Sequence, residues 1–145
     1  MIRMFDKHGL VFQYPENWNI EEESVEDGAT SVWLYSPGSA CWSVTVYPPG
    51  VDPNAAIDQV LETMQAEYRG LDLEKTVESY AGTELVGYEM NFVCLDMINT
   101  ARVQGYRDEA ATYVIFCQAE DREYAKLADV FAAITTSLLS DDARR

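Results

Sequence analysis

The stretch VFQYPENW, residues 11–18, decides the fold class that this sequence predicts. Its first residues alternate apolar and polar side chains, which is typical of a strand with one buried face. Pro15 has no backbone N–H for a sheet ladder, so the strand ends there. The turn-rich tetrad at residues 6–9 comes just before it and predicts a hairpin that joins strands at residues 2–5 and 10–14.

Short alternating segments continue along most of the chain, separated by turn-forming residues. The further predicted strands are residues 18–25, 30–35, 41–47, 72–80, 85–95, 100–107 and 111–118. The predicted turns are Asp27-Gly28 and residues 36–39, 81–82, 96–99 and 108–109. The segment TYVIFC, residues 112–117, is apolar on both faces, so it should lie in mid-sheet, covered on both sides.

Two segments have helical periodicity instead. Asp52 is a good N-cap, Pro53 suits the first helical position, and Gly70 supplies a stop, so a helix is expected over residues 53–69. A second amphipathic helix is expected over about residues 121–139, before a polar tail at residues 140–145.

The order of these elements predicts an α+β fold. Strands that follow one another through tight turns form an antiparallel sheet, and each amphipathic helix must bury its apolar stripe against that sheet. We therefore expect one domain, residues 1–145, with a central antiparallel sheet flanked by two helices in an α/β/α sandwich. The residues expected to be buried are Trp18, Trp42, Val44, Ile57, Leu61, Met64, Val114, Phe116, Phe131 and Ile134.

The net charge of the chain limits the classes of partner that it is expected to bind. Asp and Glu total 25 and Lys and Arg total 10, which gives a net charge of 10 − 25 = −15. Such an acidic surface repels phosphate backbones and anionic membranes, so neither nucleic acid nor a membrane is an expected partner. The charge either serves solubility alone or attracts a basic protein.

The N-terminus and the cysteines indicate the cellular compartment and the oxidation state of the thiols. The first seven residues turn polar before an apolar signal-peptide core can form, and no apolar run reaches the ~20 residues of a membrane span. Cys41, Cys94 and Cys117 are odd in number and lack the spacing of a zinc or redox motif. We expect buried, reduced thiols in a cytoplasmic protein.

The run GLVFQYPENW, residues 9–18, resembles the start of PsbP-like domains. The element order and the C-terminal helix, which ends VFAAITTSL at residues 130–138, are similar to that superfamily as well. The superfamily includes the photosystem II subunit PsbP, a nuclear Ran-GTPase-binding protein and bacterial DcrB-like proteins. The resemblance implies a non-enzymatic binding or adaptor role without a cofactor. No targeting or lipoprotein sequence accompanies it here, and no residue-level function carries over.

Residues for catalysis or metal binding are scarce. The sole histidine, His8, lies in a turn, and no GxSxG, Walker or GxGxxG motif is present. The acidic run at residues 21–23 lacks the spacing of an EF-hand loop and is better explained as a solvated edge that blocks strand aggregation. We therefore expect neither a metal site nor a catalytic residue.

One polar sheet face is the candidate binding surface. Alternation places Glu74, Thr76, Glu78 and Tyr80 on the same face as the five residues proposed to bind a ligand: Glu89, Asn91, Arg102, Gln104 and Tyr106. An ordinary solvated face explains this pattern too. Arginine and aromatic side chains nevertheless favour a groove for a peptide or small molecule, provided that the helices leave the face open. A protein-binding adaptor is thus the expected function, and a small enzyme or small-molecule-binding protein that uses this face is the alternative.

Overall fold

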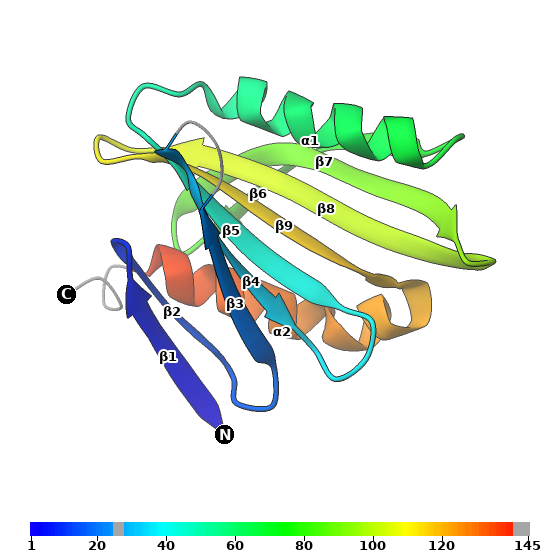
Figure 1. Ribbon diagram of the computed structural model, residues 1–145, viewed down its shortest axis with the longest axis horizontal. Coiled ribbons are helices and arrows are strands. Elements are labelled where there is room, and N and C mark those ends of the chain that lie inside the picture. Colours follow the sequence, from blue (N-terminus) through cyan, green and yellow to red (C-terminus); the bar gives the residue numbers. More distant parts are fainter. Residues whose placement is uncertain (25–27, 141–145) are drawn as a thin grey trace.

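The computed structural model describes residues 1–24 and 28–140 as an α+β fold with one large antiparallel sheet, a separate hairpin and two helices (Figure 1). The seven-stranded sheet has the order β3-β4-β5-β9-β8-β7-β6. The strands are β1 (Ile2–Lys7), β2 (Leu10–Pro15), β3 (Asn19–Ser24), β4 (Thr30–Tyr35), β5 (Cys41–Tyr47), β6 (Asp72–Tyr80), β7 (Thr83–Cys94), β8 (Met97–Arg107) and β9 (Thr112–Glu120), and the helices are α1 (Pro53–Glu67) and α2 (Asp121–Leu139).

The central strand of the sheet is β9, which carries the segment TYVIFC. It pairs with β5 on one side and with β8 on the other, both antiparallel. Val114 and Ile115 point to opposite faces and both are buried. The prediction that this segment lies mid-sheet and is covered on both sides is confirmed.

The first two strands form a hairpin that does not join the large sheet. The turn is His8-Gly9 alone, both with positive φ, so β1 extends to Lys7 and the predicted four-residue turn was too long. Phe12 of this hairpin packs against Trp42 of β5, with ring centroids 5.1 Å apart. The hairpin therefore covers part of one sheet face.

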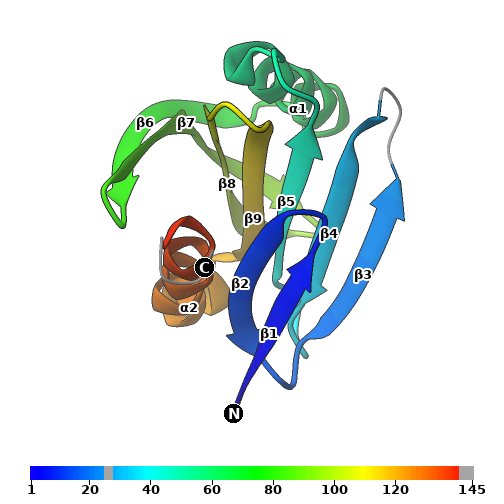
Figure 2. The same cartoon turned by 90° about the vertical axis from the view of Figure 1, so that its left-hand side faces the viewer.

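Helix α1 packs on the opposite face, over β8 and β9 (Figure 2). The carboxylate of Asp52 accepts a hydrogen bond from the backbone N–H of Asn54 at 2.9 Å and caps the helix. The helix ends at Glu67, two residues earlier than predicted, because Tyr68 adopts an extended backbone and stacks on Phe92, with centroids 4.3 Å apart.

Helix α2 lies beside the hairpin, so helix and hairpin together cover their face of the sheet (Figure 2). The indole N–H of Trp42 donates to Thr135 Oγ1 at 3.1 Å and joins this helix to β5. The predicted sandwich is confirmed in part, since one outer layer is a helix and the other is a helix with two strands.

The remaining boundaries differ from the predictions mainly at turns. The turn predicted at residues 96–99 is wrong: β7 and β8 are joined by Leu95-Asp96, both with positive φ, and β8 begins at Met97. The Ala81-Gly82 turn is confirmed. Strand β3 starts at Asn19, and the predictions for Val25, Asp27 and the tail at residues 141–145 lie outside the described residues.

Nine of the ten residues predicted to be buried are buried. The exception is Phe116, which is half-buried on the α1 side of β9. There it contacts Trp33 at the side of the helix, where α1 no longer covers the sheet completely.

Candidate functional site

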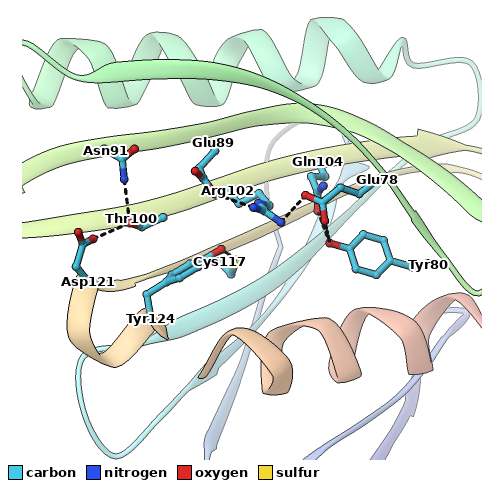
Figure 3. Close-up of polar contacts among 10 residues, drawn as sticks. All are labelled: Glu78, Tyr80, Glu89, Asn91, Thr100, Arg102, Gln104, Cys117, Asp121 and Tyr124. Atoms are coloured by element: carbon cyan, nitrogen blue, oxygen red, sulfur yellow. Dashed lines mark hydrogen bonds and ion pairs between the residues drawn. The ribbon is translucent and has the colours of Figure 1, made fainter. Parts of the chain in front are cut away.

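The five predicted binding residues do share one face of the sheet, the face that α2 and the hairpin cover. The register pairs Glu89 with Arg102 and Asn91 with Thr100, across the neighbouring strands β7 and β8. Gln104 and Tyr106 follow Arg102 at alternate positions of β8. Helix α2 passes over this face, so it is a partly enclosed space and not an open groove (Figure 3).

A cavity of about 220 Å³ lies between the polar strands and α2; we call it the α2 cavity. Its sheet side carries polar groups and its helix side is mainly apolar. The lining residues are Glu78, Tyr80, Arg102, Gln104, Ile115, Cys117, Tyr124, Ala128, Phe131, Ala132 and Thr135.

Arg102 is the main charged group of this cavity. Its Nη1 lies 2.5 Å from Glu78 Oε1, and its Nη2 donates to Glu89 Oε1 at 2.6 Å. Burial alone would lower the pKa of Arg102, but the hydrogen bond to Glu89 and the nearby charges raise it well above its ordinary value. Arg102 therefore stays charged, and the three ionic groups together carry one net negative charge.

The other titratable groups of the cavity are held neutral. Burial is the largest cause that raises the pKa of Tyr124 and of Tyr80. Burial also raises the pKa of the Cys117 thiol to about 12, although the Tyr124 hydroxyl, 3.9 Å from its sulfur, acts in the opposite direction. Such a thiol is a poor nucleophile at neutral pH, because the thiolate is the reactive form.

Three polar atoms in this region are buried without a hydrogen-bond partner among the described residues. They are Arg102 Nε, Gln104 Nε2 and Thr76 Oγ1. Thr76 and Gln104 stand opposite each other across β7, at Gly87, which pairs with both. Buried polar groups in native proteins nearly always have a partner, either a protein group or an ordered water, so these atoms mark positions where water or a further polar group can bind.

Three of the five predicted residues, Glu89, Asn91 and Tyr106, do not line the cavity, and Glu89 is linked to it only through its hydrogen bond with Arg102. Asn91 donates to Thr100 Oγ1 at 2.9 Å, and Thr100 donates in turn to Asp121 at 2.6 Å, which joins the sheet to the first residue of α2 (Figure 3). Tyr106 stacks on Tyr113 with centroids 4.8 Å apart. Asn91 and Tyr106 therefore contribute to the scaffold around the site.

Sequence reasoning missed several lining residues. Glu78 and Tyr80 were on the correct face by alternation, but the binding prediction stopped at the two strands that followed. Cys117 and Tyr124 come from β9 and α2, and the sequence predicted only a buried thiol for Cys117. No local pattern showed that α2 would lie over Arg102.

The free cysteines differ in exposure. Cys117 is buried, but Cys41 and Cys94 are half-buried, so the prediction of three buried thiols is wrong for two of them. Cys41 begins β5 and Cys94 ends β7, and a strand end is less completely covered than its centre. Burial nevertheless raises the pKa of Cys41 to about 11.

The acidic run at residues 21–23 lies on β3, an edge strand, as expected for charges that protect an edge. Glu22 Oε1 lies 2.7 Å from His8 Nε2 and its other oxygen lies 3.3 Å from Lys7 Nζ, which ties this edge to the hairpin. Within residues 1–24 and 28–140, no group of three or more His, Cys, Asp or Glu side chains is arranged to hold a metal ion. In the same residues, no helix is long and apolar enough to cross a membrane.

Comparison with solved structures shows which fold this is. Cyanobacterial PsbP (CyanoP) from Synechocystis sp. PCC 6803 superimposes with a TM-score of 0.58 at 15% sequence identity, over 94% of this chain and 90% of that one. The chain has the PsbP-like fold. The resemblance noted at residues 9–18 and 130–138 is thereby confirmed at the level of the fold.

Two further structures share the PsbP-like fold with this chain. PA94 from Pseudomonas aeruginosa, a protein of unknown function, has a TM-score of 0.54 at 10% identity, with 94% of this chain and 95% of that chain covered. LpqN from Mycobacterium tuberculosis, involved in cell envelope biogenesis, has a TM-score of 0.50 at 14% identity, with 92% and 87% covered. No family model and no curated protein matches the sequence.

Proposed function

We propose that this PsbP-like protein is a non-enzymatic adaptor that binds another protein through the tip of its β7–β8 hairpin. The observation that carries the proposal is a group of exposed apolar side chains at this tip. Val93, Leu95, Met97 and Ile98 are 63%, 87%, 40% and 57% exposed. We call these four residues the hairpin tip.

The hairpin tip extends beyond the rest of the sheet. The pairing of β8 with β9 begins at Asn99, opposite Glu120, whereas Ile98 pairs only with Val93 of β7. Figure 1 shows the two strands projecting past the ends of their neighbours. The apolar side chains of the tip therefore lack a covering layer within the fold, and such exposed clusters commonly mark contact sites.

Charge around the hairpin tip defines the chemistry of the proposed partner. Asp96 lies in the turn itself, and Asp72 pairs with Asn91, two residues before Val93. Asp121 accepts a hydrogen bond from Thr100, two residues after Ile98. Together with the net charge of −15, these carboxylates favour a partner surface with an apolar centre and a basic rim. Such a partner is the basic protein that the composition already suggested.

The properties of the polar groups favour binding over catalysis in this proposal. His8 lies on the hairpin turn against Glu22, away from the α2 cavity. The Cys117 thiol, with a pKa of about 12, is a poor nucleophile, and Arg102 is engaged by two carboxylates. A cytoplasmic location is part of the proposal and is supported by three unpaired cysteines.

Affinity capture with matched variants tests the adaptor role. The variant Leu95→Ser/Ile98→Ser replaces two apolar residues of the hairpin tip. The control variant Ile2→Ser/Met4→Ser replaces two similarly exposed apolar residues of β1. Wild type and the β1 variant should capture the same basic protein from a lysate of the source organism, identified by mass spectrometry, and the tip variant should lose it. Reconstituted binding should weaken as salt rises. Equal capture by all three proteins, or an acidic captured protein, would contradict the proposal.

A further inference from the structure

We propose that the α2 cavity is a binding site for a small uncharged amide with a branched apolar substituent. In this site the ligand carbonyl accepts from Gln104 and Arg102, its N–H faces the carboxylate of Glu78, and its apolar group lies against α2. The site is independent of the hairpin tip and adds a small-molecule ligand to the proposed protein contact.

Gln104 is the most informative residue of the cavity. Its side chain is 3% exposed, so water cannot satisfy its amide from bulk solvent. Its Oε1 lies 3.3 Å from the Tyr80 hydroxyl, whose single proton is shared with Glu78 Oε2 at 3.2 Å, and its Nε2 has no partner among the described residues. A buried donor without a partner is unfavourable, so an acceptor placed in the cavity removes that penalty.

Arg102 presents a second donor to the same region. Its two terminal nitrogens are engaged by Glu78 and Glu89, which leaves Nε, and that atom is buried without a partner among residues 1–24 and 28–140. The two carboxylates hold the guanidinium in place (Figure 3). Arg102 and Gln104 occupy alternate positions of β8 on one face and both line the cavity, so an acceptor bound there lies beside both side chains.

The net charge of the groups around the cavity favours an uncharged ligand. Glu78, Glu89 and Arg102 sum to one negative charge, which disfavours a carboxylate or phosphate in a partly desolvated space. An ammonium group suits the carboxylates, but it has no lone pair to accept from Gln104. An amide supplies both an acceptor and a donor without a net charge.

The size and helix side of the cavity define the substituent. The volume of about 220 Å³ corresponds to roughly seven waters at ~30 Å³ each, enough for a branched four-carbon amide. Phe131, Ala128 and Ala132 of α2 and Ile115 of β9 supply the apolar wall. A branched alkyl group matches these surfaces.

The first test titrates three probes of one skeleton into isotope-labelled protein: isobutyramide, isobutyrate and isobutylammonium. Isobutyramide should shift the side-chain amide resonances of Gln104 and saturate with a Kd on the order of 10 mM, as expected for a ligand of this size. The other two probes should bind at least about 10-fold more weakly, a difference of ~1.4 kcal/mol. Equal binding of all three probes would overturn the proposal.

Matched variants locate the site. Gln104→Glu replaces the donor by a carboxylate oxygen and should weaken isobutyramide binding about 10-fold or more, a loss of ~1.4 kcal/mol. Gln65→Glu makes the same change on an exposed turn of α1, on the other side of the sheet, and should bind like wild type. Unchanged binding in Gln104→Glu would show that the probe does not use the cavity.

A measurement on the wild-type protein keeps the proposal testable if Gln104→Glu does not fold. Cys117 lines the cavity, whereas Cys41 and Cys94 do not. Saturating isobutyramide should slow alkylation of Cys117 severalfold and leave Cys41 and Cys94 unchanged. Equal rates with and without the amide, or no saturable shift of Gln104 up to about 0.1 M, would rule the site out.

Discussion

Arg102 Nη1 lies 2.5 Å from Glu78 Oε1, although these residues belong to β8 and β6, with β7 between them. Glu78 pairs with Leu85 and Arg102 pairs with Glu89, so the line that joins them crosses β7 at Gly87. Gly87 carries no side chain at this crossing. The ion pair thus joins two strands of the sheet that are not neighbours.

Replacing Arg102 by methionine should destabilise the protein by about 1–3 kcal/mol, because Glu78 and Glu89 lose their shared counter-charge in a partly buried site. This expected loss of stability is smaller than the loss from breaking a fully buried ion pair, because the three side chains remain partly exposed. Urea unfolding measures it. Arg122→Met is the matched control, because Arg122 is 83% exposed in its pair with Glu120, and we expect no measurable change in stability. Equal losses of stability in Arg102→Met and Arg122→Met would show that the ion pairs of Arg102 do not stabilise the fold.

Gly87→Ala should be among the most damaging changes of one methyl group in this chain. A Cβ at this position would lie 1.9 Å from the carbonyl oxygen of Val103, so the β7 and β8 backbones must separate. We expect a loss of about 3 kcal/mol in thermal or urea unfolding. Gly105→Ala is the comparison, because its Cβ would meet Ile57 Cδ1 and a backbone oxygen at 3.1 Å, and about 1 kcal/mol is expected. A larger loss of stability in Gly105→Ala than in Gly87→Ala would show that β7 can shift to accommodate the added methyl group.

Glu123 should make stability depend on acid pH. Burial alone would raise the pKa of Glu123, but hydrogen bonds from the Ser39 and Ala40 backbone N–H groups and the Ser36 and Ser39 hydroxyls outweigh it and lower the pKa. A carboxylate with a depressed folded pKa stabilises the fold above its unfolded pKa of about 4.5, and this stabilisation is lost as pH falls through the folded value.

Unfolding of wild type and Glu123→Gln at several pH values measures this effect. The variant should be less stable at pH 7 by about 1 kcal/mol at most, because Glu123 is partly exposed and solvent screens its charge, and the difference should shrink below pH 4.5. Glu62→Gln, on an exposed turn of α1, is the control and should change little at either pH. A difference between wild type and Glu123→Gln that is constant with pH would exclude the carboxylate as its cause.

Cys117 should be the slowest of the three thiols to react in the native protein. It is buried, and burial raises its pKa to about 12, whereas the half-buried Cys41 has a pKa of about 11. Alkylation followed by mass spectrometry should show Cys117 labelled last at neutral pH and all three labelled rapidly in denaturant. Rapid native labelling of Cys117 would mean that the α2 cavity opens widely.

Local pattern in the sequence determined most of the secondary structure. Alternation in β4, β5 and β6 and the caps around α1 depend on neighbouring residues alone, and their predicted starts agree with the structure. The central place of β9 followed from apolar residues on both faces, since only a covered strand tolerates them. Alternation also placed Glu89, Arg102 and Gln104 on one face, because side chains of a strand alternate whatever its partners are.

Tertiary structure alone decided what covers that face and which residues meet there. The ion pair of Arg102 with Glu78 depends on the register of three strands, and the approach of Tyr124 to Cys117 depends on where α2 lies. Residues 11–18 predicted a hairpin, but its place outside the large sheet comes from packing of Phe12 against Trp42. These contacts join segments far apart in the chain, and their free energy comes from burial between layers, which no local sequence pattern encodes.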